Sequence, residues 1–243
     1  MPLRPAVFVP LILAGLGLVF LGVAPWLLFN ESSQRDLERG RSLASASAAT
    51  LPAHAAGETV LLEGRLAAGN RAVFRDFVAC QRDRYLGEET SGVNKGKERW
   101  QPLETITPPL QVETGDGTVA IVNQGYELRG SPHRWWDKAD RTNLTGREGE
   151  RAHGFFAGDQ VMVEGRVVEV PSANGTASTR ALEAQVLSAG DRAAYLAYLR
   201  GGVLATRIIG GVFLGVGALL VFVGGWFLRK GLRAGKGPRP ARH

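Results

Sequence analysis

Residues able to carry out acid–base, nucleophilic or metal chemistry are few and scattered in this 243-residue chain. There is one cysteine, Cys80, and the four histidines lie far apart, at positions 54, 133, 153 and 243. The chain has no Gly-x-Ser-x-Gly elbow, no phosphate-binding loop and no His-Glu-x-x-His pair, so no sequence motif pairs a nucleophile with its base. A single cysteine excludes an intrachain disulfide and a zinc site of three or four cysteines. We predict no catalytic, metal-binding or cofactor-binding residue, and we expect Cys80 to be a buried structural thiol.

The local feature that most suggests binding is the tripeptide Arg134-Trp135-Trp136, which lies in a polar stretch. Tryptophan and arginine are frequent anchors of protein interfaces, and tryptophan also favours the membrane–water interface. The alternative is that the two indoles cover the mouth of a β-barrel as a small satellite core. The surrounding stretch, residues 127–154, is too long for a simple turn. We predict that it is either a functional loop or a disordered insert.

The distribution of charge argues against a nucleic-acid-binding protein. The formal charge is +6, but residues 31–200 hold all 23 acidic residues and 21 of the 29 Lys and Arg, which gives this segment a formal charge of −2. The other eight basic residues lie near the two ends, with no acidic residue beside them. This pattern is typical of the flanks of membrane-spanning segments and not of a surface that binds nucleic acid.

Two uncharged runs are long enough to cross a membrane. Residues 208–228 contain 21 residues without a charge, and at about 1.5 Å per residue a helix of this length spans the roughly 30 Å hydrocarbon core. Residues 6–29 form a second run, which ends in Trp-Leu-Leu-Phe and has no small-residue cleavage site. We therefore expect an uncleaved anchor and not a signal peptide. The predicted transmembrane helices are residues 6–29 and 202–228.

The charges at the ends also predict the topology. Residues 229–243 form a strongly basic tail, so the positive-inside rule places both termini in the cytoplasm. The segments between the two spans are then extracytoplasmic: a linker at residues 30–57, a β-rich domain at 58–190 and a juxtamembrane helix at 191–201. The richness in Ala, Gly and Arg favours a bacterial inner membrane.

The β-rich domain is predicted from period-two alternation with glycine-marked turns. The sequence indicates six or seven short strands, with a hairpin about Gly115-Asp116-Gly117. Pro102 indicates an edge strand or a bulge, and Gly165 a bulge or barrel corner. Asp191 is expected to cap the juxtamembrane helix. The predicted fold is an α+β membrane protein, in which two transmembrane helices flank a small, mostly-β domain that is barrel-like or a sandwich.

One predicted strand, residues 73–86, contains the cysteine. Strict alternation would place Phe77 and Cys80 on opposite faces of this strand.

The last helix also offers a packing face. Gly211 and Gly215 form a Gly-x-x-x-Gly pair, and small residues at this spacing allow helices to approach closely. The partner is either the first helix or a second protein. The basic tail either binds anionic lipid headgroups or only enforces the topology. We expect the lipid bilayer and a membrane or extracytoplasmic protein as partners, no nucleic acid, and leave the oligomeric state open.

The order of several stretches resembles that of the GIDE domain, also called the BAM or beside-a-membrane domain. These stretches are VLLEGRL, VACQRDRYL with Trp100 on the partner strand, PLQVETGDGTVAIV, GDQVMVEGRVVEV and ALEAQVLSAGDRAAYLAYLR. The resemblance covers about residues 55–230 and implies a β-rich domain between two membrane helices. The best-known relatives are organellar ubiquitin ligases whose activity lies in a RING after the second helix. The 15-residue tail here has no cysteine, so the resemblance implies the sensing or scaffolding domain and gives a ubiquitin-ligase label no support.

A second stretch, PLQVETGDGTVAIVNQGYEL, is similar to a hairpin of Surf1-type assembly factors. Those proteins also have two membrane helices around an outer β domain, but they usually carry Arg and Trp where this chain has Gln124 and Tyr126. We expect a membrane-anchored extracytoplasmic binding or scaffolding module without catalytic activity. The alternative is a Surf1-like assembly factor for a haem-copper oxidase.

Overall fold

The computed structural model describes residues 16–17, 31–136, 149–171 and 178–234 of the chain. It contains two compact units, Gly40–Tyr198 and a second one formed by Met1–Arg39 with Leu199–His243. Mostly strands and one long apolar helix make up the described residues, so the protein is of the α+β class. The predicted first transmembrane helix, residues 6–29, lies outside the described residues apart from positions 16 and 17, as does most of the basic tail.

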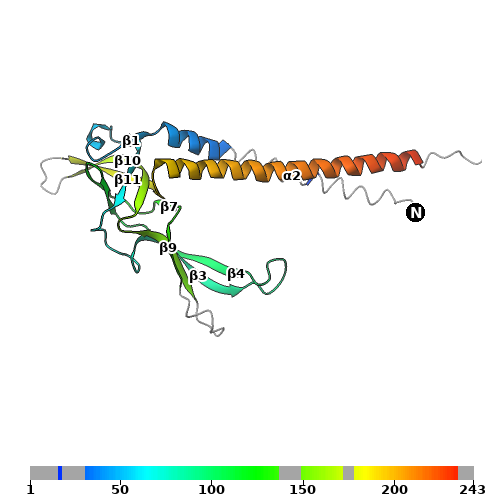
Figure 1. The fold of residues 1–243 in the computed structure, drawn as a ribbon, viewed down its shortest axis with the longest axis horizontal. Coiled ribbons are helices and arrows are strands. Elements are labelled where there is room, and N and C mark those ends of the chain that lie inside the picture. The colour runs from blue at the N-terminus through cyan, green and yellow to red at the C-terminus, as the bar shows by residue number, and fades with distance from the viewer. Residues whose placement is uncertain (1–15, 18–30, 137–148, 172–177, 235–243) are drawn as a thin grey trace, which may run out of the picture. The chain divides into compact units, whose positions relative to one another are not determined.

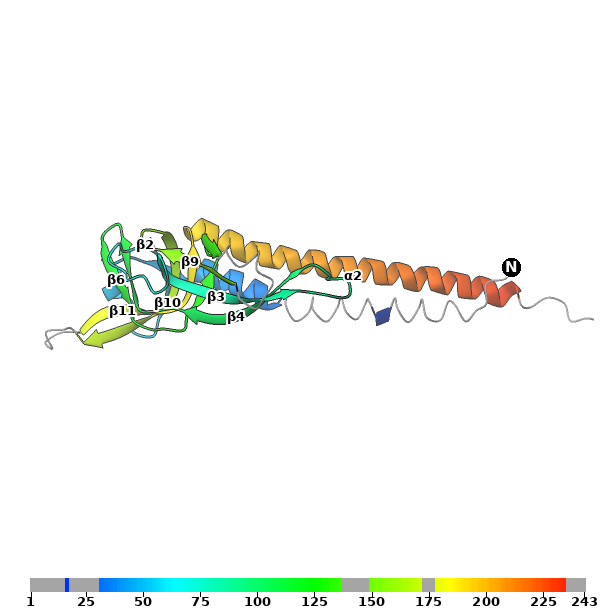
Figure 2. The same ribbon diagram turned by 90° about the horizontal axis from the view of Figure 1, so that it is seen from below.

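Five strands of the Gly40–Tyr198 unit form a barrel. Around the sheet, β2 neighbours β10, followed by β11, β6 and β5, and β5 pairs back with β2. The β6–β11 pair is parallel and the other four are antiparallel. Numbered one to five along the chain, the strands therefore neighbour each other in the order 1-2-3-5-4-1, the Greek-key arrangement of an OB-fold barrel. Figures 1 and 2 show these strands, which are β2 (Thr59–Leu66), β5 (Leu110–Thr114), β6 (Gly117–Ile121), β10 (Gln160–Pro171) and β11 (Ser178–Ala189).

Glycines lie where the barrel strands bend. Strand β2 pairs with β10 along most of its length and with β5 only at Arg65 and Leu66. Gly64 immediately precedes the two residues of β2 that pair with β5. A Cβ at Gly64 would overlap the carbonyl oxygen of Glu113. Gly165 adjoins a bulge in the β10–β11 pairing, as predicted. Bulges and glycines of this kind let a strand turn a barrel corner.

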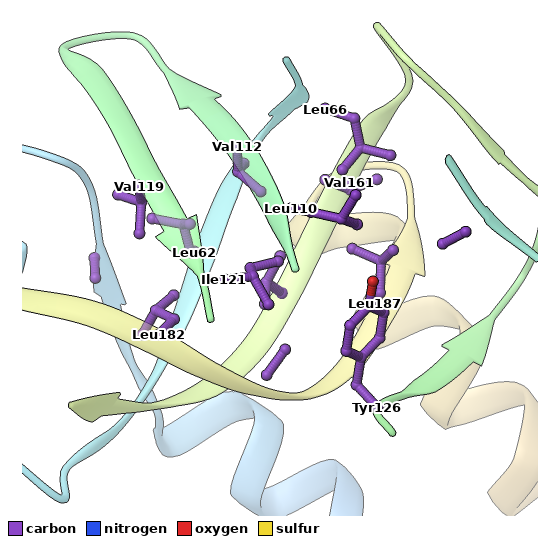
Figure 3. Close-up of a cluster of buried hydrophobic side chains, with 14 of the residues drawn as sticks. Leu62, Leu66, Leu110, Val112, Val119, Ile121, Tyr126, Val161, Leu182 and Leu187 are labelled. Carbon is purple, nitrogen blue, oxygen red and sulfur yellow. The ribbon is translucent and has the colours of Figure 1, made fainter. Parts of the chain in front are cut away.

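The barrel is filled by apolar side chains from all five strands. Figure 3 shows core residues of the barrel strands together with the adjoining Tyr126. Leu62, Leu182 and Leu187 are fully buried, and burying such a side chain contributes about 1.5–3 kcal/mol. Tyr126 donates its hydroxyl hydrogen to the carbonyl oxygen of Pro108 at 2.8 Å, which satisfies its polar group inside the core.

A second sheet is built from the two longest insertions between barrel strands. Its order is β4-β3-β9-β8, with antiparallel neighbours. The β3–β4 hairpin lies between β2 and β5 in sequence, and β8 and β9 lie between β6 and β10. Figure 1 shows the hairpin extending away from the barrel. The strands are β3 (Phe77–Glu88), β4 (Glu98–Ile106), β8 (His133–Trp136) and β9 (Glu150–Phe156).

This sheet corrects the prediction for residues 127–154. The stretch was expected to be a loop or a disordered insert, but it contains β7 (Glu127–Arg129), β8 and the start of β9. Residues 137–148 lie outside the described part of the chain. β7 and β8 have three and four residues, too few to show a periodic pattern. Pairing with β11 and β9 holds them in place, and local sequence does not reveal such long-range pairing.

The alternation predicted for β3 is also wrong at one point. Phe77 and Cys80 belong to the same small apolar cluster, which also includes Ala152. The reason is an irregularity in the β3–β9 pairing between Phe77 and Ala79, since a bulge shifts every later side chain to the other face. Cys80 is fully buried, as expected, and this burial raises the pKa of its thiol to about 11.

Part of the predicted linker has regular secondary structure. Within residues 30–57, a helix covers residues 31–42, and β1 (Ala44–Ala46) pairs with β2. The short helix η2 (Leu51–Ala53) follows. Asp116, in the β5–β6 turn, accepts hydrogen bonds from the Ser47 hydroxyl and from the backbone N–H of Ala48 and Ala49. The hydrogen bond from Ser47, followed by that from the Thr114 hydroxyl, lowers the pKa of Asp116 to about 2.

Helix α2 (Arg192–Ala234) merges the predicted juxtamembrane and transmembrane helices into one helix of 43 residues. Asp191 caps it as predicted, because its carboxylate accepts the N–H of Ala194 at 2.8 Å. Tyr195 in its first turns donates a buried hydrogen bond to Glu164 of the barrel at 2.7 Å. The helix is long and apolar enough to cross a membrane, since it contains an 18-residue stretch with a mean hydropathy of 2.3, and it is the one such helix in the described part of the chain.

Candidate functional site

Strand geometry separates the two adjacent tryptophans. Trp135 turns to the face that carries the Cys80 cluster, where its ring meets that of Phe74 edge-on at 5.4 Å. The Arg75 guanidinium lies 4.5 Å from the centre of the Trp135 ring. Trp136 turns to the opposite face and is 37% exposed. Trp135 therefore packs in a small satellite core, whereas Trp136 lies partly exposed on the other face.

The face with Trp136 carries a row of aromatic rings. The centroids of Trp136 and Trp100 are 6.2 Å apart, and those of Trp100 and Tyr85 are 5.2 Å apart. Tyr85 and Trp100 are cross-strand partners in β3 and β4. The guanidinium carbon of Arg151 lies 4.4 Å from the centre of the Trp100 ring, a cation–π contact that holds this arginine flat on the sheet.

A buried carboxylate fixes Arg151. Asp83 is 3% exposed and accepts a hydrogen bond from Arg151 Nε at 2.7 Å. Its other oxygen accepts a weaker bond from Gln81 at 3.2 Å. The two charges of this pair compensate each other, and the ion pair and the Trp100 ring together leave the guanidinium little freedom to move.

Beside Trp136 the surface forms a hollow of about 480 Å³, within the range of pockets that bind small ligands. We call it the Trp136 hollow. Leu128 contributes an apolar side chain to its lining, and Arg134 and Arg151 contribute cationic ones. The complete lining is Leu128, Gly130, Ser131, Arg134, Trp136, Arg151, Ala152 and His153.

The positive charge of the hollow resides in its arginines. Burial lowers the pKa of His153 below its ordinary value of 6.5; Asp83 opposes this effect, while Arg151 and Arg134 add to it. The imidazole is therefore neutral at neutral pH. Arg134 is exposed and makes no ion pair with any carboxylate that the structure describes. Among the residues that the structure describes, the positive charge of Arg134 at the rim of the hollow therefore has no paired carboxylate.

A second polar cluster surrounds His133. His133 lies 2.9 Å from Asp159 and stacks on Phe156 with ring centroids 3.9 Å apart. Asp159 also accepts a hydrogen bond from the backbone N–H of Phe156. The side chains of His133 and Asp159 therefore stabilise the turn between β9 and β10. No group of three metal-binding side chains occurs among the residues that the structure describes.

The predicted candidates end up in three different places. Trp136 and Arg134 share the hollow, Trp135 lies on the other face, and Gly211 and Gly215 lie in α2, where nothing described comes within 4 Å of an added Cβ. Sequence reasoning missed the other members of the hollow, above all Arg151 and His153. Their positions in β9 become informative only when β8 is known to be a strand paired with it.

Known proteins add no further guide to this site. No protein-family model matches the chain, and no curated protein matches it at a significant level. The resemblances to the GIDE domain and to Surf1-type factors therefore stay predictions.

Proposed function

We propose that this chain is a membrane-anchored binding module that holds a protein partner at the Trp136 hollow and has no catalytic residue of its own. The observation that carries the proposal is a partly exposed tryptophan beside an arginine without an ionic partner among the described residues, at the rim of a hollow. Large aromatic and arginine side chains at the centre of a contact supply most of the binding free energy in many interfaces.

The side chains that line the hollow are held in place by neighbouring residues, which favours binding without rearrangement. Trp136 and Arg134 lie on a strand that is paired along its length with β9, and Arg151 is held by Asp83 and Trp100. Side chains already fixed in position lose little conformational entropy when a partner binds.

Placement in the membrane is part of the same proposal. It rests on the apolar length of α2 and on the basic residues that follow it. The proposed topology has two spans, residues 6–29 and 202–228, with both termini in the cytoplasm of a bacterium and the folded domain on the outer side of the inner membrane. A GIDE-like scaffolding role fits this arrangement.

The barrel itself is a poor candidate for the site. OB-fold barrels commonly bind oligonucleotides across their second and third strands, which here are β5 and β6. Residues 110–121 contain no Lys or Arg, and binding of a phosphate backbone depends on such charges. We therefore place the partner on the second sheet.

The topology predicts that a cysteine introduced at the exposed Thr90 is labelled from outside the cell. The native Cys80 adds little background, because it is fully buried and its pKa is raised to about 11. Thr90→Cys should react with a membrane-impermeant maleimide in spheroplasts, and the wild-type chain should react only after unfolding. Labelling of Thr90→Cys that requires permeabilised membranes would place the domain in the cytoplasm.

Loss of the Trp136 indole is expected to weaken partner binding by about 30-fold or more, since truncating a hot-spot tryptophan costs about 2 kcal/mol or more. The measurement compares the protein captured from solubilised membranes by the full-length wild type and by Trp136→Ala. The matched control is Val93→Ala, a change at a fully exposed residue of the β3–β4 loop. A partner retained equally by wild type and Trp136→Ala would refute the proposed site.

A further inference from the structure

The charge balance of the Trp136 hollow suits an anion that carries one negative charge. Asp83 compensates Arg151 through their ion pair, His153 is neutral at neutral pH, and Arg134 has no described carboxylate partner. A carboxylate supplies the one charge that is needed, and its two oxygens match the planar fork of a guanidinium. A phosphate dianion would leave one negative charge without a counter-charge.

The strand on which the hollow lies suits an extended polypeptide. Among the described residues, β8 is the last strand of its sheet and pairs with β9 alone. No other described strand pairs with β8, and the addition of an extended segment at the edge of a sheet is a common mode of peptide recognition. In such a strand every second side chain points to the same face.

Arg134 and Trp136 are themselves two residues apart and share one face of β8. A complementary segment running along β8 would present its own side chains to them with the same spacing of two. The side chain facing Arg134 should be acidic, and the one facing Trp136 and the apolar wall of Leu128 should be apolar.

We infer that the Trp136 hollow recognises an extended acidic segment of a partner polypeptide, in which a carboxylate side chain and an apolar side chain stand two residues apart. The inference rests on the proposed function, whose partner it defines by its chemistry. The carboxylate binds Arg134, and the apolar side chain packs on the Trp136 ring.

Protonation of His153 should also strengthen the binding. The groups that face His153 are Asp83, Arg151 and Arg134. Since its pKa is lowered from 6.5, the imidazole gains a proton only as the pH falls below this value. That proton adds a second positive charge next to the bound carboxylate. Affinity should therefore rise at a pH low enough to protonate His153 and decline as the carboxylate of the ligand, whose pKa is about 4 when free, is itself protonated.

The test uses the full chain in neutral detergent micelles, labelled with 5-fluorotryptophan, and fluorine NMR of its tryptophan signals. The signal of Trp136 is assigned by comparison with Trp136→Phe. The probe is the blocked peptide acetyl-Gly-Leu-Thr-Asp-Gly-amide. It is expected to shift the Trp136 signal in a saturable manner and to leave the signal of Trp226, in α2, unchanged.

Two comparison peptides test the chemistry. Replacing the aspartate of the probe by asparagine, or exchanging Leu and Thr so that the apolar and acidic residues become adjacent, should weaken binding by about tenfold or more. Arg134→Gln should have the same effect as the asparagine peptide, and Arg134→Lys should recover part of the loss. The control is Arg166→Gln, a change at an exposed arginine of β10 that should leave binding unchanged.

Equal binding of the aspartate and asparagine peptides, or of wild type and Arg134→Gln, would overturn the inference. A shift of the Trp136 signal on adding phosphatidylglycerol alone, as large as that caused by the peptide, would overturn it in favour of a lipid headgroup. If no peptide shifts the signal while Trp136→Ala still loses its captured partner, the inference fails and the proposed function stands. If Trp136→Ala keeps its partner, the proposed function itself fails.

Discussion

Gly154→Ala is expected to destabilise the folded unit by about 3 kcal/mol, at the upper end of the typical cost of overpacking a core. Gly154 lies opposite Cys80 in the β3–β9 pair. An added Cβ would overlap the carbonyl oxygen of Ala79 and would lie 2.7 Å from the Cα and Cβ atoms of Cys80. These neighbours are mostly backbone atoms, so β3 and β9 must move apart to make room. The sheet that carries the Trp136 hollow would then be disrupted.

Labelling of Cys80 reports this opening directly, because the thiol is fully buried in the native state. A cost of about 3 kcal/mol corresponds to about a 100-fold higher rate of labelling when reclosing is fast. The control is Gly69→Ala, at a glycine where an added Cβ meets nothing within 4 Å. If the two variants react with a thiol reagent at the same rate, β3 and β9 do not approach as closely at Gly154 as the structure shows.

Gly64→Ala is expected to have a comparable cost of about 3 kcal/mol, for a reason that concerns the barrel. A Cβ at this position would overlap the carbonyl oxygen of Glu113 and would lie 2.6 Å from Val112 Cγ1. Both residues belong to β5, whose pairing with β2 closes the sheet. The substitution must therefore separate β2 from β5 or displace the core side chain of Val112.

Thermal unfolding of the full chain in detergent checks this prediction. For a unit of about 160 residues, 3 kcal/mol corresponds to a decrease of about 6–12 °C in Tm. Gly69→Ala is again the control. A Tm within about 2 °C of the wild type would indicate that β2 and β5 do not approach closely and that the barrel is open at this seam.

The local elements of the fold were largely predictable. The β5–β6 hairpin follows from an Asp-Gly turn between alternating runs, and the bulge beside Gly165 from a glycine inside a long strand. The cap of α2 follows from Asp191 before an apolar helix. Each of these features depends on residues close together in sequence, where turn and helix preferences act directly.

The features that depend on distant pairing were not predictable in this way. Closure of the barrel joins β2 to β5 across an insertion of more than forty residues. The sequence of neither strand indicates that it pairs with the other. The bulge in β3 that brings Phe77 beside Cys80 has no glycine to mark it. Both features follow from packing of the whole unit and not from local preference.

The candidate site could be predicted only in part from the sequence, because it too depends on pairing between strands. Arg134 and Trp136 stand out because tryptophan and arginine are frequent anchors of protein interfaces, but Trp135 stood out equally and proved to face the satellite core. Only the strand character of β8 distinguishes the two indoles. Arg151 and His153 joined the site through the register of β8 with β9, which a four-residue strand cannot disclose from its sequence.

The central claim is that a protein partner contacts the face of the second sheet that carries Trp136. Site-specific photocrosslinking in intact cells tests it most directly, with benzoylphenylalanine in place of Trp136 in one variant and in place of the fully exposed Val93 in another. The account predicts a discrete protein adduct from position 136 and none of the same mass from position 93. Identical adducts from both positions, or no protein adduct from position 136, would contradict it.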